Sequence, residues 1–304
     1  SCRGGPVKGE FEAIDRIRAL LPDPAPGEIG IGDDAAVAPS PREPWTLLAV
    51  DTVVAGVHAD LTLVGVDALG WKAVASNVSD IAAMGGRPAR CVVSVAGPTG
   101  TDLDALYRGV AEAARALDCP VVGGDLVSAP TLVVTVAVEG TVDGVPLRRS
   151  GARPGDVLWI TGPLGASAAG LRALRAGSAP PGLRAAHERP QPKVAEGLAA
   201  RRAGATAMID VSDGLAADLW HLAEASGVGF ELDRVPIAAG ATEDEALSGG
   251  EDYQLVFSAP ADASVREAFT GLAPPAAVGR CTATREGRYR GTPLGRLGWQ
   301  HAWR

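Results

Sequence analysis

Cysteine is scarce in this chain of 304 residues, and its arrangement excludes several kinds of site. The four cysteines, Cys2, Cys91, Cys119 and Cys281, are scattered and form no C-x-x-C pair. This spacing argues against a zinc site and against a disulfide framework. It predicts a reducing, cytoplasmic location for the protein.

Long apolar and long basic runs are also missing. The first residues, SCRGGP, have no apolar core of signal-peptide length, and no run reaches the roughly 18 apolar residues of a transmembrane helix. The formal net charge is −8. We therefore expect neither nucleic acid nor an anionic membrane as a partner. If the substrate carries phosphate groups, cations must lie between it and the protein.

The common nucleotide and hydrolase signatures are absent as well. The chain has no G-x-x-x-x-G-K-[ST] loop, no protein-kinase motif set and no G-x-S-x-G elbow. One Gly-rich turn, TGPLGASAAG, follows a predicted strand at 157–161. Its backbone N–H groups could hold a phosphate, or the turn could be only a tight strand-to-helix connection.

What is present is typical of a layered α/β or α+β enzyme. Hydrophobic residues make up 46% of the chain, with 39 glycines and 23 prolines, which fits a real core and many turns. The hydrophobic spacing predicts alternating helices and strands. The predicted helices cover 10–21, 66–84, 102–117, 213–226 and a segment after 161. The predicted strands cover 46–54, 91–97, 121–122, 131–141, 157–161, 206–209, 228–231 and 253–258, and the polar stretch 176–192 interrupts the pattern.

The turn-rich, polar segment 143–156 predicts a domain boundary near residue 150. We therefore expect an N-terminal domain over residues 1–150 and a C-terminal α/β domain over residues 151–304.

The strongest chemical signal is a set of aspartates at strand ends, at strand-to-helix turns or inside apolar segments. These are Asp33 and Asp34, Asp51, Asp80, Asp125, Asp210 and Asp213. Each has an ordinary alternative. Asp213, or Ser212 beside it, could cap a helix, Asp125 could close a turn, and Asp80 could face solvent. Asp51 is harder to explain in this way, because a buried carboxylate without a partner is costly.

Positions of this kind gather at one face of an α/β sheet, so we expect the aspartates to converge. Two like charges about 4 Å apart repel by roughly 4 kcal/mol at an effective dielectric near 20. Bound cations are then required. Hard oxygen ligands without Cys or His clusters favour Mg²⁺, which usually shares its ligand shell with substrate phosphates. The pattern alone therefore predicts magnesium-dependent nucleotide chemistry.

Eight motifs, in this order, extend the argument to a family. They are GIGDDAAV, VDTVVAGVH, NVSDIAAMGGRPAR, VVGGDL, RRSGARPGD, IDVSDGLAADL, LSGGEDYQLVF and GWQHAW. From about residue 9 to the end, the chain resembles the thiamine-monophosphate kinase family of the aminoimidazole-ribotide-synthetase-like superfamily. The resemblance implies a two-domain fold that dimerises through the N-terminal sheet. It also implies phosphoryl transfer from ATP to thiamine monophosphate with Mg²⁺.

The resemblance also implies roles for single residues. The aspartates matching Asp34, Asp51, Asp80, Asp125, Asp210 and Asp213 hold several Mg²⁺ ions. ATP contacts are implied for Tyr107, Gly124, Asp125, Arg149 and Ser212, and thiamine contacts for His58, Glu251 and Trp299. A thiazolium cation suits an aromatic face and a carboxylate, and the planar fork of Arg149 suits phosphate. The alternatives are a structural His58, a solvated Arg149, and Trp299 as a C-terminal core plug.

Two departures and two alternative functions remain open. Ala49 and Val50 precede the strand aspartate where relatives often have Ser or Thr, and the last motif ends in His301-Ala302-Trp303 where relatives often have His-Phe. An ATP-dependent ligase of the same superfamily is the nearest rival. Selenophosphate synthetase and a hydrogenase-maturation dehydratase lack their reactive cysteines here. A metal-binding relative without catalysis is the non-enzymatic alternative.

Overall fold

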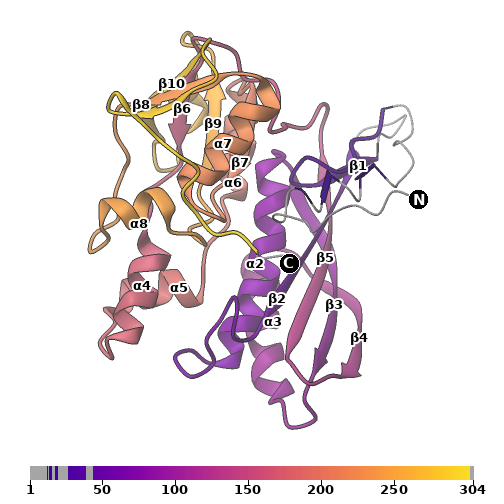
Figure 1. The fold of residues 1–304 in the computed structure, drawn as a ribbon. Coiled ribbons are helices and arrows are strands. Elements are labelled where there is room, and N and C mark those ends of the chain that lie inside the picture. Colours follow the sequence, from indigo (N-terminus) through magenta and orange to yellow (C-terminus); the bar gives the residue numbers. More distant parts are fainter. Residues whose placement is uncertain (1–11, 13, 16–17, 20–26, 39–43, 302–304) are drawn as a thin grey trace, which may run out of the picture.

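The computed structural model describes residues 12, 14–15, 18–19, 27–38 and 44–301. Within them the chain forms two lobes, each built on its own β-sheet (Figure 1). Most of the helix predicted over 10–21 and the last two residues of the GWQHAW motif lie outside the described residues. None of the helices in the described part combines the length and the apolar character needed to cross a membrane.

The N-terminal lobe is an antiparallel sheet with one parallel edge pair, covered on one face by two helices (Figure 1). In the described residues the sheet has five strands, in the order β1-β2-β5-β3-β4. The strands are β1 (Ala36–Ala38), β2 (Trp45–Val54), β3 (Arg87–Gly97), β4 (Val121–Ser128) and β5 (Val133–Val142), and the helices are α2 (Val66–Ala83) and α3 (Leu103–Ala116).

Alternation along the strands explains the two faces of this sheet. Val134, Val136 and Val138 of β5 are buried under the helices, and so are Ala49 and Val53 of β2. Successive side chains in a strand point to opposite faces. The sheet therefore buries one apolar face and leaves the other exposed.

Strand β4 differs from the prediction. The strand expected at 121–122 continues to Ser128 and pairs in parallel with β3. A Cβ on Gly124 would lie 2.0 Å from the carbonyl oxygen of Val93, so only glycine permits this pairing. The sequence indicated that Asp125 ends a strand. In the structure it lies inside β4 instead. It pairs with Ser94 on β3, on the face turned away from the helices.

The C-terminal lobe has a seven-stranded sheet in the described residues, in the order β12-β11-β8-β10-β6-β9-β7. Its strands are β6 (Val157–Ile160), β7 (Ala207–Asp210), β8 (Gly229–Leu232), β9 (Leu255–Ala259), β10 (Ala276–Thr282), β11 (Gly287–Tyr289) and β12 (Thr292–Pro293). Its helices are α4 (Ala166–Arg175), α5 (Pro181–Glu188), α6 (Val194–Arg202), α7 (Leu215–Ser226), α8 (Glu243–Ser248) and α9 (Val265–Ala268). Helix α5 lies in the segment 176–192, where no element was predicted. Pro181 stands at its first position, where proline suits a helix.

Helix α2 joins the two lobes. It packs against β2 and β5 on one side and against α6 and β7 on the other. Nearly every residue of α2 is buried, including the polar residues Lys72, Asn77 and Ser79. Polar groups on α2 are therefore presented to the junction between the lobes. The strands of the two sheets are separated by the segment 143–156, and we propose that the domain boundary lies there.

Candidate active site

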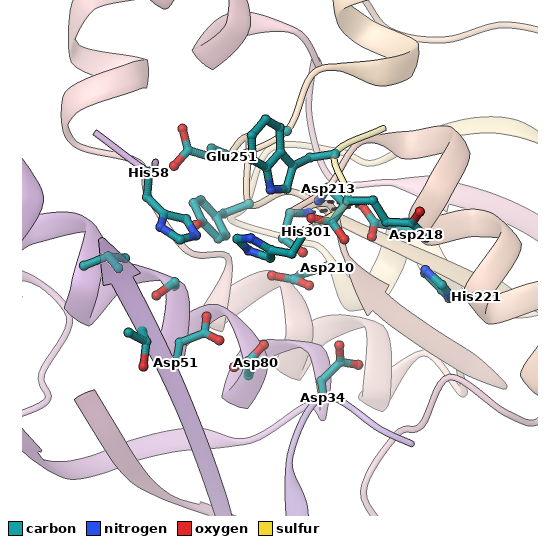
Figure 2. A pocket seen from close by; sticks show the side chains of 18 of the residues that line it. Asp34, Asp51, His58, Asp80, Asp210, Asp213, Asp218, His221, Glu251 and His301 are labelled. Carbon is teal, nitrogen blue, oxygen red and sulfur yellow. Dashed lines mark hydrogen bonds between the residues drawn. The ribbon is translucent and has the colours of Figure 1, made fainter. Parts of the chain in front are cut away.

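A cavity of about 1360 Å³ lies at the junction of the lobes (Figure 2). Ten of the predicted site residues line it. They are Asp34, Asp51, His58, Asp80, Arg149, Asp210, Ser212, Asp213, Glu251 and Trp299. The structure therefore brings together ten side chains from both lobes, and the predicted convergence is found for five of the aspartates, Asp34, Asp51, Asp80, Asp210 and Asp213.

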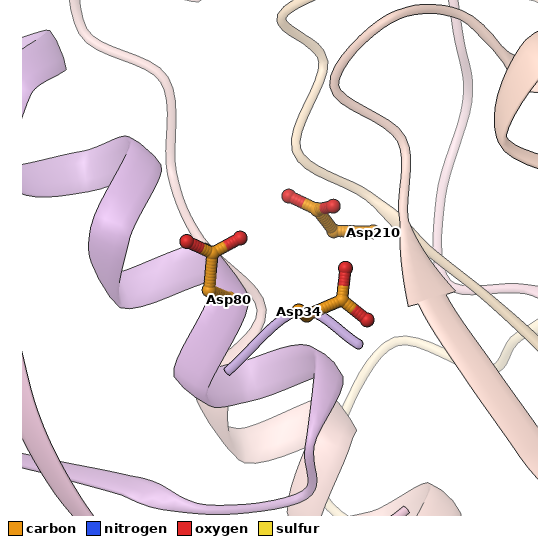
Figure 3. A group of neighbouring side chains, drawn as sticks. All are labelled: Asp34, Asp80 and Asp210. Atoms are coloured by element: carbon orange, nitrogen blue, oxygen red, sulfur yellow. The ribbon is translucent and has the colours of Figure 1, made fainter. Parts of the chain in front are cut away.

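Three carboxylates that line the cavity lie close together (Figure 3). One oxygen each from Asp34, Asp80 and Asp210 lies within 4.8 Å of the others. Asp34 precedes β1, Asp80 lies near the end of α2, and Asp210 ends β7. The packing of α2 against β7 thus brings together aspartates more than 100 residues apart. Ser79 donates a 2.6 Å hydrogen bond from its hydroxyl to Oδ2 of Asp210.

Burial makes this cluster electrostatically costly. It raises the pKa of the Asp80 carboxyl well above its ordinary value, and the charges of Asp51, Asp210 and Asp34 raise it further. Burial and the charge of Asp34 also raise the pKa of Asp210, to about 7, against the lowering effect of the Ser79 hydrogen bond. A carboxylate cluster with these properties favours a proton or a cation in its centre.

Arg149 approaches the cluster from the segment between the two sheets. Its Nε and Nη2 donate to the same oxygen of Asp34, Oδ1, at 3.2 and 2.7 Å. The other oxygen, Oδ2, is buried and has no hydrogen-bond partner among the described residues. A buried carboxylate oxygen of this kind needs a ligand. The hard oxygen donors and this unsatisfied atom fit a divalent cation such as Mg²⁺.

The backbone around Arg149 is anchored from both lobes. Its N–H donates to Oδ1 of Asp33 at 2.7 Å, and its carbonyl accepts from the Ser226 hydroxyl at 3.0 Å. Burial raises the pKa of Asp33, although the hydrogen bond from Arg149 lowers it. The guanidinium is thus held at a set position, which a solvated surface arginine would not have.

Asp218 shapes the loop that carries Ser212 and Asp213. Its Oδ2 accepts hydrogen bonds from the backbone N–H groups of Ser212, Asp213 and Gly214 at 3.1, 3.2 and 3.0 Å. Burial raises the pKa of the Asp218 carboxyl well above its ordinary value, and the Asp213 charge adds to this. Gly214 has a φ of +126°, which only glycine adopts easily. The turn from β7 into α7 is therefore built around one buried carboxyl.

Aromatic rings line the part of the cavity beside His58 (Figure 2). The His58 and His301 rings lie 5.2 Å apart, and the Trp299 and His301 rings lie 5.9 Å apart in an edge-to-face arrangement. Trp299 is 52% exposed, which does not fit a buried C-terminal plug. Its backbone N–H donates to the Asp213 carbonyl at 3.0 Å. This row of rings offers faces to a flat or cationic ligand.

Glu251 lies beside the same rings. Its Oε2 accepts a 2.8 Å hydrogen bond from Nζ of the buried Lys72. His187 Nδ1 is 3.7 Å from the same oxygen and 3.1 Å from the Ser167 hydroxyl. Burial and the Lys72 charge lower the pKa of His187 to about 4, so this imidazole is neutral at neutral pH. The Glu251 carboxylate is thus paired with Lys72.

Three predicted residues lie away from the cavity. Gly124 and Asp125 are on β4, at the edge of the N-terminal sheet. Tyr107 is on α3, 37% exposed, and lines a separate hollow with Arg108 and Arg115. Within one chain the structure does not bring these residues to the acidic cluster, and their roles stay predictions.

Sequence reasoning missed Lys72, His187, Asp218 and His301. Lys72 could have been identified from the sequence, because it is a charged residue inside the same mostly apolar helix as Asp80. His301 and Asp218 stand inside two of the motifs, GWQHAW and IDVSDGLAADL. His187 had no signal, because it lies in the segment where no helix was expected.

Comparison with known proteins agrees with this architecture. Residues 32–142 match the family model of the AIR synthase related protein N-terminal domain, and residues 153–291 match its C-terminal domain. Thiamine-monophosphate kinase of Mycobacterium tuberculosis is 42% identical over 290 residues, covering 89% of this chain and 87% of that protein. Thiamine-monophosphate kinase of Bacillus subtilis is 38% identical over 266 residues, covering 81% and 82%.

The chain belongs to the thiamine-monophosphate kinase family.

A solved structure of the family extends the match to three dimensions. The structure, AaThiL complexed with AMPPCP and TMP, superposes on this chain with a TM-score of 0.87 at 31% identity, covering 97% of both chains. The two-domain fold that the motifs implied for the thiamine-monophosphate kinase family is thereby confirmed in this chain.

Proposed function

We propose that this chain transfers the γ-phosphoryl group of ATP to thiamine monophosphate, forming thiamine diphosphate and ADP. The Asp34–Asp80–Asp210 cluster, with the buried, unsatisfied Oδ2 of Asp34, is the observation that carries the proposal. Acidic residues that must meet two phosphorylated substrates need cations between protein and ligand. The match to a structure of an ATP analogue with TMP supports this pair of substrates.

The proposed metal site uses the three clustered carboxylates together with Asp51 and Asp213, which line the same cavity. Magnesium held there supplies charge neutralisation for the two phosphate groups and helps to align them. The remaining catalytic work belongs to the side chains around the cluster.

In the proposed reaction, an oxygen of the acceptor phosphate attacks the γ-phosphorus in line with the bond to the β-phosphate oxygen. The new P–O bond forms as the old one breaks, and ADP leaves with the bonding electrons. A phosphate monoester is already largely ionised near neutral pH, so the residues need not supply a strong base. We assign Arg149 to the transferring phosphoryl group because its guanidinium is fixed beside Asp34. Ser212 is assigned to ATP.

The acceptor end is assigned to the aromatic row. Trp299 and His58 offer ring faces to the thiazolium cation, and Glu251 adds a carboxylate nearby. This arrangement directs the phosphate of the acceptor toward the aspartates while the cationic ring stays among the aromatic side chains.

We further propose that the chain acts as a homodimer through the open face of the N-terminal sheet. Leu48, Val50, Val92 and Val127 lie on this face and are between 43% and 64% exposed. These apolar side chains, with the polar row of Thr52, Thr135, Ser94 and Asp125 among them, form a surface that a second copy could bury. Asp125 lies on the same face, and we propose that it acts across that interface.

The test is a coupled ADP-release assay with Mg·ATP and thiamine monophosphate, with chromatography to identify thiamine diphosphate. Asp51→Asn and Asp80→Asn variants run beside the wild type. Asp262→Asn is the matched control, because Asp262 is exposed and does not line the cavity. Free thiamine serves as the control acceptor.

We expect thiamine diphosphate from the wild type and from Asp262→Asn, but not from the two cavity variants or with free thiamine. ATP binding without any diphosphate product would overturn the acceptor assignment and favour the ligase alternative. Metal binding without any turnover would favour the non-catalytic relative.

A further inference from the structure

One lysine occupies an unusual position at the junction of the lobes. Lys72 lies in the middle of α2 with its residue fully buried, and it does not line the cavity. A lysine is almost never buried completely unless its ammonium group is paired. Its partners therefore indicate what it does.

Both observed contacts of the Lys72 ammonium are to residues of the acceptor end. Nζ donates to Oε2 of Glu251 at 2.8 Å and to the backbone carbonyl of His58 at 3.2 Å. The Lys72 side chain is 1% exposed, whereas that of Glu251 is 26% exposed and reaches the cavity. Lys72 is thus shielded from any ligand, and its two hydrogen bonds connect it to the cavity through these two neighbours.

The face of α2 that carries Lys72 also carries Asp80 of the acidic cluster. Lys72, Ser76 and Asp80 follow one another at intervals of four residues, and Ser76 and Asp80 line the cavity. Residues spaced by four lie on one face of a helix. At about 1.5 Å per residue, the Cα atoms of Lys72 and Asp80 are about 12 Å apart along the helix. One rigid helix thus connects the acidic cluster with the group that holds Glu251.

The two segments that Lys72 contacts, the Glu251 turn and the His58 turn, each have a specific local geometry. Glu251 has a φ of +64°, which is uncommon for a residue with a side chain, and its N–H donates to the Ser212 carbonyl at 2.8 Å. The His58 turn closes on itself, since the Val54 N–H donates to Nδ1 of His58 at 3.0 Å. Lys72 therefore joins α2, the His58 turn and the Glu251 turn at one buried point.

We propose that Lys72 is a positioning residue for the acceptor, which holds the Glu251 carboxylate and the His58 turn in register with the acidic cluster on α2. This inference rests on the proposed function and deepens it. Lys72 does not contact the acceptor phosphate, because its ammonium is enclosed and already directed at Glu251 and His58. Its removal therefore acts on binding of the cationic ring, while the ATP end keeps its contacts.

The experiment is a double-mutant cycle with Lys72→Met, Glu251→Gln and the combined variant. The KM for thiamine monophosphate, the KM for ATP and kcat are measured separately, and thermal melting checks that each variant is folded. Lys193→Met is the matched control, because Lys193 lies at the start of α6 and does not line the cavity. Lys72→Arg is added because it keeps the charge but changes the donor geometry.

We expect Lys72→Met and Glu251→Gln each to raise the KM for thiamine monophosphate about tenfold, with the double variant no worse than either, as for residues in direct contact. The KM for ATP should stay within about twofold of the wild type, the level at which distant sites behave independently. Additive losses, or equal changes in both KM values, would overturn the proposal.

Two further outcomes are also decisive. If Lys72→Met does not fold, Lys72→Arg is the variant that tests the proposal, because it keeps the charge but changes the geometry of the contact with Glu251. A rise confined to the KM for thiamine monophosphate then supports the proposal, and unchanged KM values overturn it. A wild type that forms no thiamine diphosphate defeats the proposed function itself. An active wild type whose KM values do not respond to these variants defeats only the assignment of Lys72.

Discussion

Arg149 directs two of its nitrogens at a single oxygen of Asp34, at 3.2 and 2.7 Å, and leaves the other oxygen of that carboxylate buried without a hydrogen-bond partner among the described residues. Burial acts to lower the pKa of Arg149, but the Asp34 charge and hydrogen bonds outweigh it and raise the pKa. The guanidinium therefore stays charged, and one Asp34 oxygen remains available to a cation.

The first prediction concerns this free oxygen. Asp34→Asn should abolish most of the kinase activity, with a loss above the roughly 10–100-fold that removal of an outer-shell partner of a metal causes. Arg149→Lys should lose roughly 10–100-fold of the activity, because lysine keeps a charge but cannot direct two donors at Asp34. Steady-state ADP release measures both. Activity of Asp34→Asn within a few-fold of the Asp262→Asn control would contradict the assignment.

The second prediction uses the mutual repulsion of the cluster. Without divalent metal, Asp80→Asn should raise the melting temperature, because it removes a carboxyl that is costly to ionise beside Asp34 and Asp210. A gain of about 1 kcal/mol corresponds to roughly 2–4 °C in a domain of 150–250 residues. Added Mg²⁺ should then stabilise the wild type more than the variant. Melting curves in EDTA and in MgCl₂ give both quantities, and equal magnesium responses would argue against the site.

The cluster also shows what sequence could establish. Asp80 was identified because a carboxylate in an apolar helix needs an explanation, and the predicted bounds 66–84 agree with α2 (Val66–Ala83) within one residue. The same reasoning applied to Lys72 would have marked it as a second charged residue that needs a partner. Local periodicity cannot show which helix face meets the other lobe, so the pairing with Glu251 needed the structure.

Asp125 shows the opposite case. The letters VVGGD predict a strand that ends at a turn, since two glycines usually break a strand. Here Gly124 allows close parallel pairing with β3, so β4 continues and Asp125 points to the open face. That outcome depends on a partner strand about 30 residues away in sequence, which the local pattern does not contain. Helix α5 was missed because a polar, proline-containing segment resembles a loop.

The third prediction is a pH dependence of stability. The pKa of His187 is lowered from 6.5 to about 4 in the folded chain. Between these values an unfolded-state His187 binds more protons than the folded one, so the His187 contribution to stability is lost as the pH falls from about 7 toward 4, by about 1.4 kcal/mol for each unit of pKa difference. His187→Asn keeps an acceptor for the Ser167 hydroxyl and should flatten this slope.

Urea unfolding at several pH values between 7.5 and 5 measures the effect. His221 also has a pKa lowered to about 4 by burial and nearby positive charges, whereas the raised pKa values of Asp210, about 7, and Asp252, about 6, act in the opposite sense. The difference in slope between the wild type and His187→Asn therefore measures the effect. A His187→Asn variant with the same slope as the wild type would show that His187 does not contribute.

The fourth prediction tests the proposed dimer. Leu48→Lys and Val92→Lys place charges on the exposed face of the N-terminal sheet, where a partner copy would bury them. A buried charge without a partner is costly, so the dimer should dissociate at micromolar concentration while each chain stays folded. Val145→Lys is the control, because Val145 is 69% exposed and lies in the turn after β5. Light scattering after size exclusion measures the molecular mass of each variant. An unchanged dimer mass in both sheet variants would rule out this face as the dimer interface.

The fifth prediction separates the charge of Asp218 from its hydrogen bonds. One of its oxygens accepts three backbone N–H groups of the turn that carries Ser212 and Asp213. In Asp218→Asn the amide oxygen can take the same place, so fold and activity should change little. Asp218→Ala leaves those donors without this acceptor, at about 1–3 kcal/mol for a buried group. It should also reduce activity by about 10–100-fold, as for a residue that orients metal ligands. Urea unfolding measures the stability of the two variants, and ADP release measures their activity. Equal losses in Asp218→Asn and Asp218→Ala would mean that the charge of Asp218 contributes more than its hydrogen bonds to the turn.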